Sequence, residues 1–149
     1  MHLLPITPDP ATQDPLLADP ACQEILAMTL AYYEAVGYAP PWISYFAVLD
    51  GRVVGSGAFK GGPQQGQVEI AYMTFDAWQH RGIGTDVCRL LVALARRSDP
   101  DLRITARTLP TENYSTRILR NNGFVLLGTV EDPEDSEVWN WEYRSDQPH

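Results

Sequence analysis

The most informative stretch of the chain is Gln79-His80-Arg81-Gly82-Ile83-Gly84-Thr85, which lies between a segment of strand character and an amphipathic segment. Its small residues let backbone N–H groups approach a ligand closely, and the N-terminus of a following helix adds unpaired donors and the positive end of a dipole. Arg81 and His80 can add positive charge, although a neutral and exposed His80 is the simpler interpretation. The stretch is therefore predicted to bind a diphosphate.

Two other kinds of glycine-rich phosphate loop fit this stretch poorly. A P-loop needs Gly-Lys followed by Ser or Thr, and the lysine that would reach a terminal phosphate is missing here. A Rossmann turn needs a third glycine, but Val87 holds that position, and the stretch lies in mid-chain rather than in a leading βαβ unit. The sequence favours neither class.

Upstream of this stretch, three segments have the pattern of an antiparallel meander. Asp50-Gly51 is a strong hairpin turn between the apolar run Ser44–Leu49 and its partner Val53–Lys60. A glycine-rich loop then leads to a third predicted strand, Val68–Phe75. The meander delivers the chain directly to the predicted diphosphate loop.

The N-terminal part of the chain is predicted to hold one helix. Asp19-Pro20 is typical of an N-cap followed by proline in the first helical position, and Gly37 is typical of a helix end. Four prolines in residues 1–18 allow no more than a short edge strand there.

Downstream, the pattern indicates a helix, a strand, a second helix and two final strands. The ranges are Gly84–Arg97, Leu102–Leu109, Asn113–Asn122, Phe124–Val130 and Val138–Tyr143. A strand–helix–strand unit from Val68 to Leu109 implies one parallel pair with a right-handed crossover. The predicted fold class is α+β (mixed α/β): a central, mixed, mostly antiparallel sheet of six to seven strands flanked by helices.

Composition narrows the class of protein. A chain of 149 residues suits one domain, 1–149, with residues 145–149 as a disordered tail. The net charge of −8 argues against a nucleic-acid partner, since phosphate neutralisation needs clustered Lys and Arg. No membrane span or leader pattern is present, so we expect no membrane partner and a cytoplasmic location. Cys22 and Cys88 are predicted to be buried thiols, with no metal site.

Two motifs together resemble one family. Gln79–Gly84 resembles the Arg/Gln-x-x-Gly-x-Gly/Ala coenzyme A loop of the GNAT superfamily, and Asn113–Phe124 resembles its second signature. The second motif is most similar to the branch that contains the ribosomal-protein-alanine acetyltransferases. The resemblance implies a GNAT-like fold that binds acetyl-CoA as cosubstrate and transfers acetyl to a primary amine. The transfer would be a direct attack in a ternary complex, without a metal.

The resemblance also implies which residues bind the cofactor. Backbone N–H groups around the end of the third strand would hold the thioester carbonyl and pantetheine, and the loop would hold the diphosphate. By resemblance Asn113 also contacts the cofactor, although helix capping accounts for it equally well. The implied set is Met73, Thr74, Phe75, Gln79, His80, Arg81, Gly82, Ile83, Gly84, Thr85 and Asn113.

Acetyl transfer to an amine needs a neutral amine, stabilisation of the oxyanion and a proton or positive dipole for the departing thiolate. Glu69 is the predicted base, because a carboxylate among apolar strand neighbours is costly unless it is exposed, paired or functional. A salt-bridged glutamate is the open alternative. By resemblance Ser115 lies near the sulfur as a proton donor; as a bare residue it is capping material.

One departure from the family puts the general acid in doubt. Many GNAT enzymes have a tyrosine four residues before the glycine of Gly-Phe, whereas this chain has Leu119 before Gly123. Ser115 is a weak acid, and Tyr114 or water are the alternatives. A non-catalytic acyl-CoA-binding module on the same fold therefore stays open, as does a different nucleotide enzyme that binds ATP or NAD.

The acceptor amine is not specified by the sequence. Trp42 and Tyr72 are predicted to line its site, Trp42 because it follows Pro40-Pro41 just before a strand. The acidic segment Glu131–Glu137 is either a solvated hairpin tip or a surface that attracts a basic acceptor. Protein N-termini, aminoglycosides, polyamines and free amino acids all stay open, and so does a homodimer.

Overall fold

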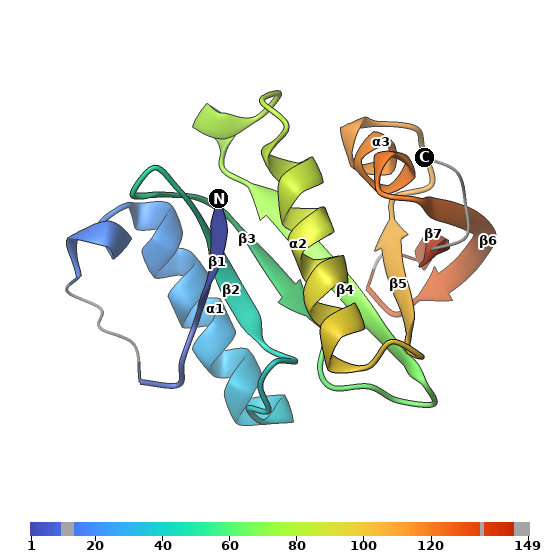
Figure 1. The fold of residues 1–149 in the computed structure, drawn as a ribbon, viewed down its shortest axis with the longest axis horizontal. Helices are drawn as coiled ribbons and strands as arrows, with labels where there is room; N and C mark the ends of the chain where they lie inside the picture. Colours follow the sequence, from blue (N-terminus) through green and yellow to red (C-terminus); the bar gives the residue numbers. More distant parts are fainter. Residues whose placement is uncertain (10–13, 135, 145–149) are drawn as a thin grey trace.

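The computed structural model describes residues 1–9, 14–134 and 136–144. These residues form one seven-stranded sheet of order β1-β2-β3-β4-β5-β7-β6, with three α-helices (Figure 1). The strands are β1 (His2–Pro5), β2 (Ser44–Leu49), β3 (Arg52–Phe59), β4 (Gln67–Thr74), β5 (Arg103–Thr108), β6 (Phe124–Asp132) and β7 (Ser136–Tyr143). The helices are α1 (Pro20–Val36), α2 (Ile83–Ser98) and α3 (Tyr114–Asn121), with short 3-10 turns η1 (Pro15–Leu17) and η2 (Asp76–Trp78).

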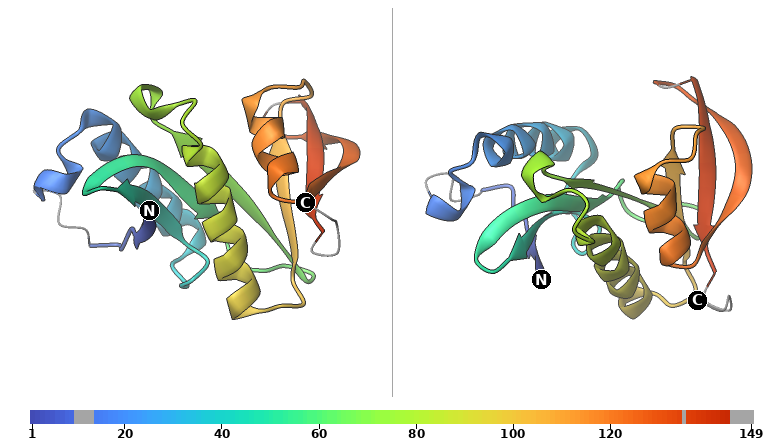
Figure 2. Two further views of the ribbon diagram at one scale, coloured as in Figure 1. Left: turned by 45° about the horizontal axis from the view of Figure 1, so that its top comes forward. Right: turned by 90° about the horizontal axis from the view of Figure 1, so that it is seen from above.

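The sheet is mixed, as predicted. β4 and β5 pair in parallel, and every other neighbouring pair of described strands is antiparallel. α2 makes the crossover between the two parallel strands and lies with α3 on one face of the sheet, whereas α1 lies on the opposite face (Figure 2). The two faces of the central strand β4 therefore meet different helices.

Local sequence signals account for where the helices start and stop. The Asp19 side chain accepts a hydrogen bond from the Ala21 N–H at 2.8 Å, which caps α1, and Gly37 ends it with φ of 94°. α2 follows Gly82, whose φ of 78° lies in the left-handed region that favours glycine. These boundaries differ from the predicted ones by about one residue, within the usual uncertainty of helix ends.

The core lies between the sheet and its helices. Val87, Cys88 and Leu91 on α2 are completely buried, as is Cys22 on α1. Both cysteines are free thiols, so their prediction as buried thiols is confirmed. Trp141 on β7 is the largest of the fully buried side chains and packs beneath α3.

The prediction for the acidic segment Glu131–Glu137 was wrong in part. β6 continues through Asp132 and β7 begins at Ser136, with Glu131 paired to Glu137 across the hairpin. The polar composition suggested a loop, but cross-strand pairing and an ion pair between Asp132 and Arg107 override that local signal. Asp135 and the predicted disordered tail 145–149 lie outside the described residues.

No helix in the described ranges is long and apolar enough to cross a bilayer.

Candidate active site

The parallel pairing of β4 and β5 stops before either strand ends. Its last pair is Ile70 with Ala106, whereas β4 continues to Thr74 and β5 to Thr108. Residues 71–74 of β4 therefore have no paired partner on the β5 side within the described strands. We call this part of β4 the open edge.

The direction of the backbone groups along the open edge follows from its pairing with β3. The Phe75 N–H donates to the Val54 carbonyl at 2.9 Å, and the Glu69 carbonyl accepts from the Lys60 N–H at 2.8 Å. Since alternate residues direct their backbone groups to opposite sides of a strand, Tyr72 and Thr74 point theirs toward β5. The Phe75 N–H is thus not free to bind a cofactor as the sequence suggested, because β3 already uses it.

The glycine loop delivers the N-terminus of α2 next to the open edge. His80 and Gly82 both have positive φ, 64° and 78°, so the chain turns sharply into the helix. The first helical bond runs from the Asp86 N–H to the Gly82 carbonyl at 3.1 Å. The N–H groups of residues 83–85 therefore have no acceptor within the helix, and they supply the donors that a diphosphate needs.

Gly84 lies where α2 and α3 pack closely together. A Cβ added there would lie 2.5 Å from Ile118 Cδ1 and 3.5 Å from Thr74 Oγ1. Real Cβ atoms do not approach side chains that closely, so a larger residue here would force Ile118 to move, and glycine lets α3 pack closely against α2. At Gly82, by contrast, an added Cβ meets nothing within 4 Å, and the positive φ alone favours glycine.

A cavity of about 170 Å³ opens above this turn. Seven of the residues predicted to bind the cofactor line it: Thr74, Gln79, His80, Gly82, Ile83, Gly84 and Thr85. Five further residues that sequence reasoning missed complete the lining: Trp78, Tyr114, Arg117, Ile118 and Asn121. Four of these missed residues belong to α3, and no local pattern signals that α3 packs over the loop.

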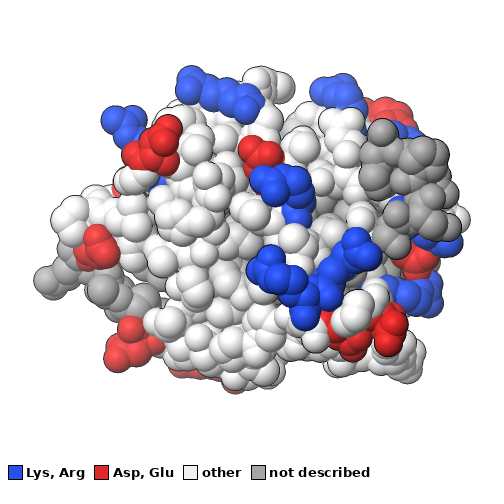
Figure 3. All heavy atoms as spheres, viewed as in Figure 1, with Lys and Arg blue, Asp and Glu red and all other residues white. Residues whose placement is uncertain are grey.

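Basic side chains lie in the wall of this cavity and beside it. Arg117 lines it, and the guanidinium of Arg81 stacks over the Trp78 ring at 5.0 Å beside it. Figure 3 shows basic side chains, which in α2 are all arginines, along the line of this helix, although the whole chain carries a net charge of −8. Free N–H groups, a left-handed glycine and nearby cations fit a diphosphate, so the residues present suit the coenzyme A that the sequence predicted.

Tyr72 and Ser115 meet at the open edge. The Tyr72 hydroxyl donates to the Ser115 carbonyl at 3.2 Å, and the Tyr72 and Ser115 hydroxyl oxygens lie 3.4 Å apart. Burial raises the pKa of Tyr72 well above its usual value, against the smaller lowering effect of Ser115. The phenol therefore keeps its proton and can donate a hydrogen bond, but it gives the proton up less readily than an exposed tyrosine.

The start of α3 is held by a capping box. Asn113 Oδ1 accepts from the Thr116 N–H at 3.1 Å, and Thr116 Oγ1 accepts from the Asn113 N–H at 3.0 Å. The capping interpretation of Asn113 is thus observed, and Asn113 does not line the cavity. Leu119 is completely buried in the core, so no acid reaches the site from that position.

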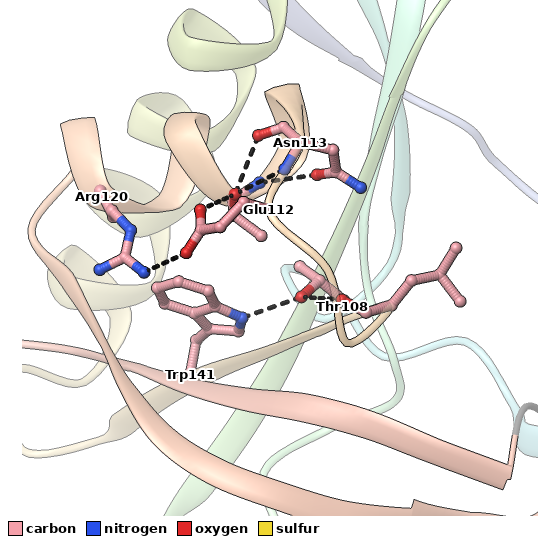
Figure 4. A network of polar contacts seen from close by, with 7 residues as sticks. Thr108, Glu112, Asn113, Arg120 and Trp141 are labelled. Atoms are coloured by element: carbon pink, nitrogen blue, oxygen red, sulfur yellow. Dashed lines mark hydrogen bonds and ion pairs between the residues drawn. The ribbon is translucent and has the colours of Figure 1, made fainter.

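A polar network fixes α3 to the sheet (Figure 4). Glu112 accepts from Thr116 Oγ1 at 2.8 Å and from Arg120 at 2.6 Å, and these two partners lower the pKa of its carboxyl. The Arg120 guanidinium lies 4.9 Å from the centre of the Trp141 ring, whose N–H donates to Thr108 Oγ1 at 3.0 Å. The network sets the position of Tyr114 and Ser115 through α3.

Glu69 lies on the other face of β4, paired with two cations. Its Oε2 is 2.9 Å from Lys60 Nζ, in a geometry that makes no hydrogen bond, and its Oε1 is 3.8 Å from Arg107 Nε. Arg107 also contacts Asp132 at 3.1 Å. The salt-bridged alternative for Glu69 is thus present in the structure, and it does not by itself exclude a role as base.

The remaining predicted residues lie on both sides of β4. Met73 is 46% exposed and lines a groove between β4 and α1, which Tyr72 also reaches. Trp42 packs edge-to-face on Phe59, with ring centres 5.1 Å apart, and does not line that groove. Within the described ranges, no group of three or more His, Cys, Asp or Glu side chains is placed to hold a metal ion.

A family model described as an acetyltransferase (GNAT) domain matches residues 3–125. The chain belongs to the GNAT acetyltransferases. The resemblance drawn from the two motifs is therefore confirmed. A separate search of curated proteins found no match.

Several solved structures have the same fold. The aminoglycoside acetyltransferase AAC(6')-Ib in complex with coenzyme A is 24% identical, with a TM-score of 0.59 over 68% of this chain and 66% of that one. RimL, a ribosomal L7/L12 α-N-protein acetyltransferase in complex with coenzyme A, is 18% identical, with a TM-score of 0.64 over 82% and 70%. The microcin C7 self-immunity acetyltransferase MccE, in complex with acetyl-CoA and AMP, is 14% identical, with a TM-score of 0.65 over 82% and 69%. At these sequence identities the likeness establishes the fold alone. The matched part of this chain covers just under two thirds of the length of the aminoglycoside enzyme.

Proposed function

We propose that this GNAT protein transfers the acetyl group of acetyl-CoA to a primary amine by direct attack in a ternary complex. The observation that carries the proposal is the open edge of β4 next to the free N-terminus of α2. The open edge would offer backbone groups to the thioester and pantetheine of the cofactor, and the N-terminus of α2 would offer N–H donors to its diphosphate. The structures of coenzyme A complexes that share this fold support the choice of cofactor.

In this proposal the protein positions the reactants and moves protons. Acetyl-CoA supplies an activated acyl group; the amine nitrogen bonds to the carbonyl carbon, the C–S bond breaks, and the amine loses one proton. The Thr74 N–H, directed into the open edge, would hydrogen-bond to the carbonyl oxygen as negative charge develops on it. Glu69, directly or through water, would take the proton that the amine gives up.

The departing thiolate would be stabilised near Ser115. The Tyr72 hydroxyl already contacts Ser115, and its raised pKa keeps it as a neutral hydrogen-bond donor. With Leu119 buried, the proton itself would come from Ser115 or from water. The reaction as proposed requires no metal ion and no nucleic acid.

The first test is thermal stability of the purified protein with acetyl-CoA, CoA, ATP and NAD in parallel. A ligand that binds only the native state stabilises it by RT ln(1 + [L]/Kd), so specific binding appears as a rise in melting temperature. We expect a rise with acetyl-CoA and CoA alone. No rise with either, or a larger one with ATP or NAD, would contradict the proposal.

The second test separates the enzyme from a non-catalytic acyl-CoA-binding module. The buried Leu119 in place of the family's usual tyrosine favours this alternative. The measurement is release of free CoA thiol with and without a panel of amines. Amine-dependent release supports the enzyme; tight CoA binding without release on any amine supports the module.

A further inference from the structure

A groove runs along the face of the sheet that α1 covers, and it reaches the open edge of β4. It consists of two adjoining hollows of about 220 and 360 Å³ that share Met28, Thr29, Ser44, Ala58 and Ala71. One end is formed by Ala71, Tyr72 and Met73, the residues that border the open edge. A molecule in this groove therefore approaches β4 from the side opposite to the diphosphate cavity.

The groove is lined by apolar side chains that are unusually exposed. Met28 is 63% exposed, Met73 46% and Tyr32 39%, and they come from α1 and β4. Among the described residues, none of those lining the groove is an aspartate or a glutamate, and its one ionic side chain is Lys60 at the far end. Lys60 pairs with Glu69, whose second partner, Arg107, is also a cation.

These charges discriminate between the classes of acceptor amine. A polyamine or an aminoglycoside would bring several ammonium groups into a groove whose described lining residues include no carboxylate and which carries a lysine at one end. The Glu69 carboxylate beside that lysine is already paired with Lys60 and Arg107. Burying a cation without a partner is costly, and a like charge raises the cost. Although the whole chain carries a net charge of −8, no acidic residue is among the described residues that line this groove.

We propose that the acceptor is a small monoamine with an apolar or aromatic carbon skeleton and no second cationic group. This inference rests on the proposed function. The skeleton would pack on Met28, Tyr32 and Met73, which directs the amine toward the open edge. An apolar lining disfavours the ammonium form, so the groove would also help to present the neutral amine that attack requires.

The test compares three amines in the amine-dependent release of CoA: 2-phenylethylamine, spermidine and the aminoglycoside kanamycin. We expect kcat/KM for 2-phenylethylamine to exceed that for the two polycations by at least about tenfold. Binding of each amine to the protein–CoA complex, measured by calorimetry, gives the same order without turnover. A higher kcat/KM or tighter binding for spermidine or kanamycin would overturn the inference.

A matched pair of variants locates the preference in the groove. Met28→Glu adds a carboxylate at an exposed position of the groove, and Leu127→Glu adds the same charge at an exposed position of β6 that does not line it. We expect Met28→Glu to weaken 2-phenylethylamine binding and strengthen spermidine binding by at least about tenfold in their ratio, and Leu127→Glu to leave the ratio unchanged. An unchanged ratio in Met28→Glu, or an equal change in both variants, would overturn the inference.

Two further outcomes are distinguishable. Absence of acetyl-CoA binding would remove the proposed function itself, whereas CoA binding with turnover of polycations removes only the inference on the acceptor. A second copy of the chain in the groove would appear as a dimer in sedimentation that Met28→Glu dissociates and Leu127→Glu does not. That result would also overturn the inference, because the groove would then be an interface.

Discussion

The two faces of β4 have opposite characters. Toward α2 and α3, Thr74 faces a compact cavity bordered by a glycine turn, free helix N–H groups and the guanidinium of Arg117. Toward α1, Ala71 and Met73 face an open groove of methionine, tyrosine and alanine side chains. One strand therefore separates a site suited to an anion from a site suited to an apolar body, and the reacting groups of two substrates would meet at its open edge.

One of the two largest expected effects concerns the cofactor side of β4. Gly84→Val would push against Ile118 and Thr74, since an added Cβ already lies 2.5 Å from Ile118. Overpacking should lower the free energy of unfolding by about 1–3 kcal/mol. Because it also displaces the α3 wall of the cavity, we expect a roughly tenfold to hundredfold weaker affinity for CoA, measured by calorimetry. Gly57→Ala is the control, because its Cβ would meet Val87 and Leu91 beneath α2, away from the cavity. Equal loss of affinity in both variants would contradict the role assigned to Gly84.

An effect of similar size is expected on the opposite face of β4, where Glu69 lies. Glu69→Gln is expected to lower kcat about 100-fold while CoA affinity stays unchanged, because a general base contributes about that factor or more. Asp132→Asn is the control, since it removes another carboxylate partner of Arg107. Small and equal effects of the two variants on kcat would show that Glu69 is only an ion-pair partner.

Two variants test how each face of the sheet holds the helix packed on it: one removes a buried indole donor beneath α3, and the other removes a buried hydroxyl donor on α1. Trp141→Phe removes the donor to Thr108 under α3, and Tyr33→Phe removes the α1 hydroxyl that donates to the Ile6 carbonyl at 2.8 Å. Each change should lower the free energy of unfolding by about 1–3 kcal/mol in urea denaturation. Only Trp141→Phe should also weaken CoA binding, because α3 lines the cavity. A weaker CoA affinity in Tyr33→Phe would contradict this division between the faces.

The smallest expected effect is a loss of folding stability at alkaline pH caused by the buried thiol of Cys88 on α2. Burial raises the pKa of Cys88 from 9.0 to about 12. The unfolded thiol therefore ionises first, so its stabilising contribution is complete below pH 9 and is lost as pH rises toward 12. At pH 9.5 the loss should be less than about 1 kcal/mol. Urea denaturation at pH 7.5 and 9.5 measures it, and Cys88→Ala should reduce the difference; an unchanged difference would assign it to other groups.

Much of the fold was predictable because its signals are local. The Asp19 cap, the Asp50-Gly51 turn and the stripe of α2 each act within a few residues, and all three appear where the sequence placed them. The place of β7 between β5 and β6 was not predictable. It depends on pairing between segments far apart in the chain, which the alternation of either strand does not encode.

The candidate site divides in the same way. The glycine loop could be predicted from the sequence because the residue before α2, Gly82, has the left-handed backbone conformation that favours glycine. The contributions of Trp78 and Arg117 to the cavity were missed, since they depend on how η2 and α3 pack. Trp42 was expected in the acceptor site for its position after two prolines; in the structure it packs on Phe59, and its contact with the acceptor stays a prediction.

The sequence by itself determined the order of the elements, the mixed sheet and the glycine loop before α2, because turns, caps and periodicity act over short distances. Only the tertiary structure decided which backbone groups of β4 remain unpaired, which side chains face the loop from α3, and that the groove on the α1 side has no carboxylate among its described lining residues. Those properties arise where segments distant in sequence meet, and the free energy of packing and pairing between them selects the arrangement.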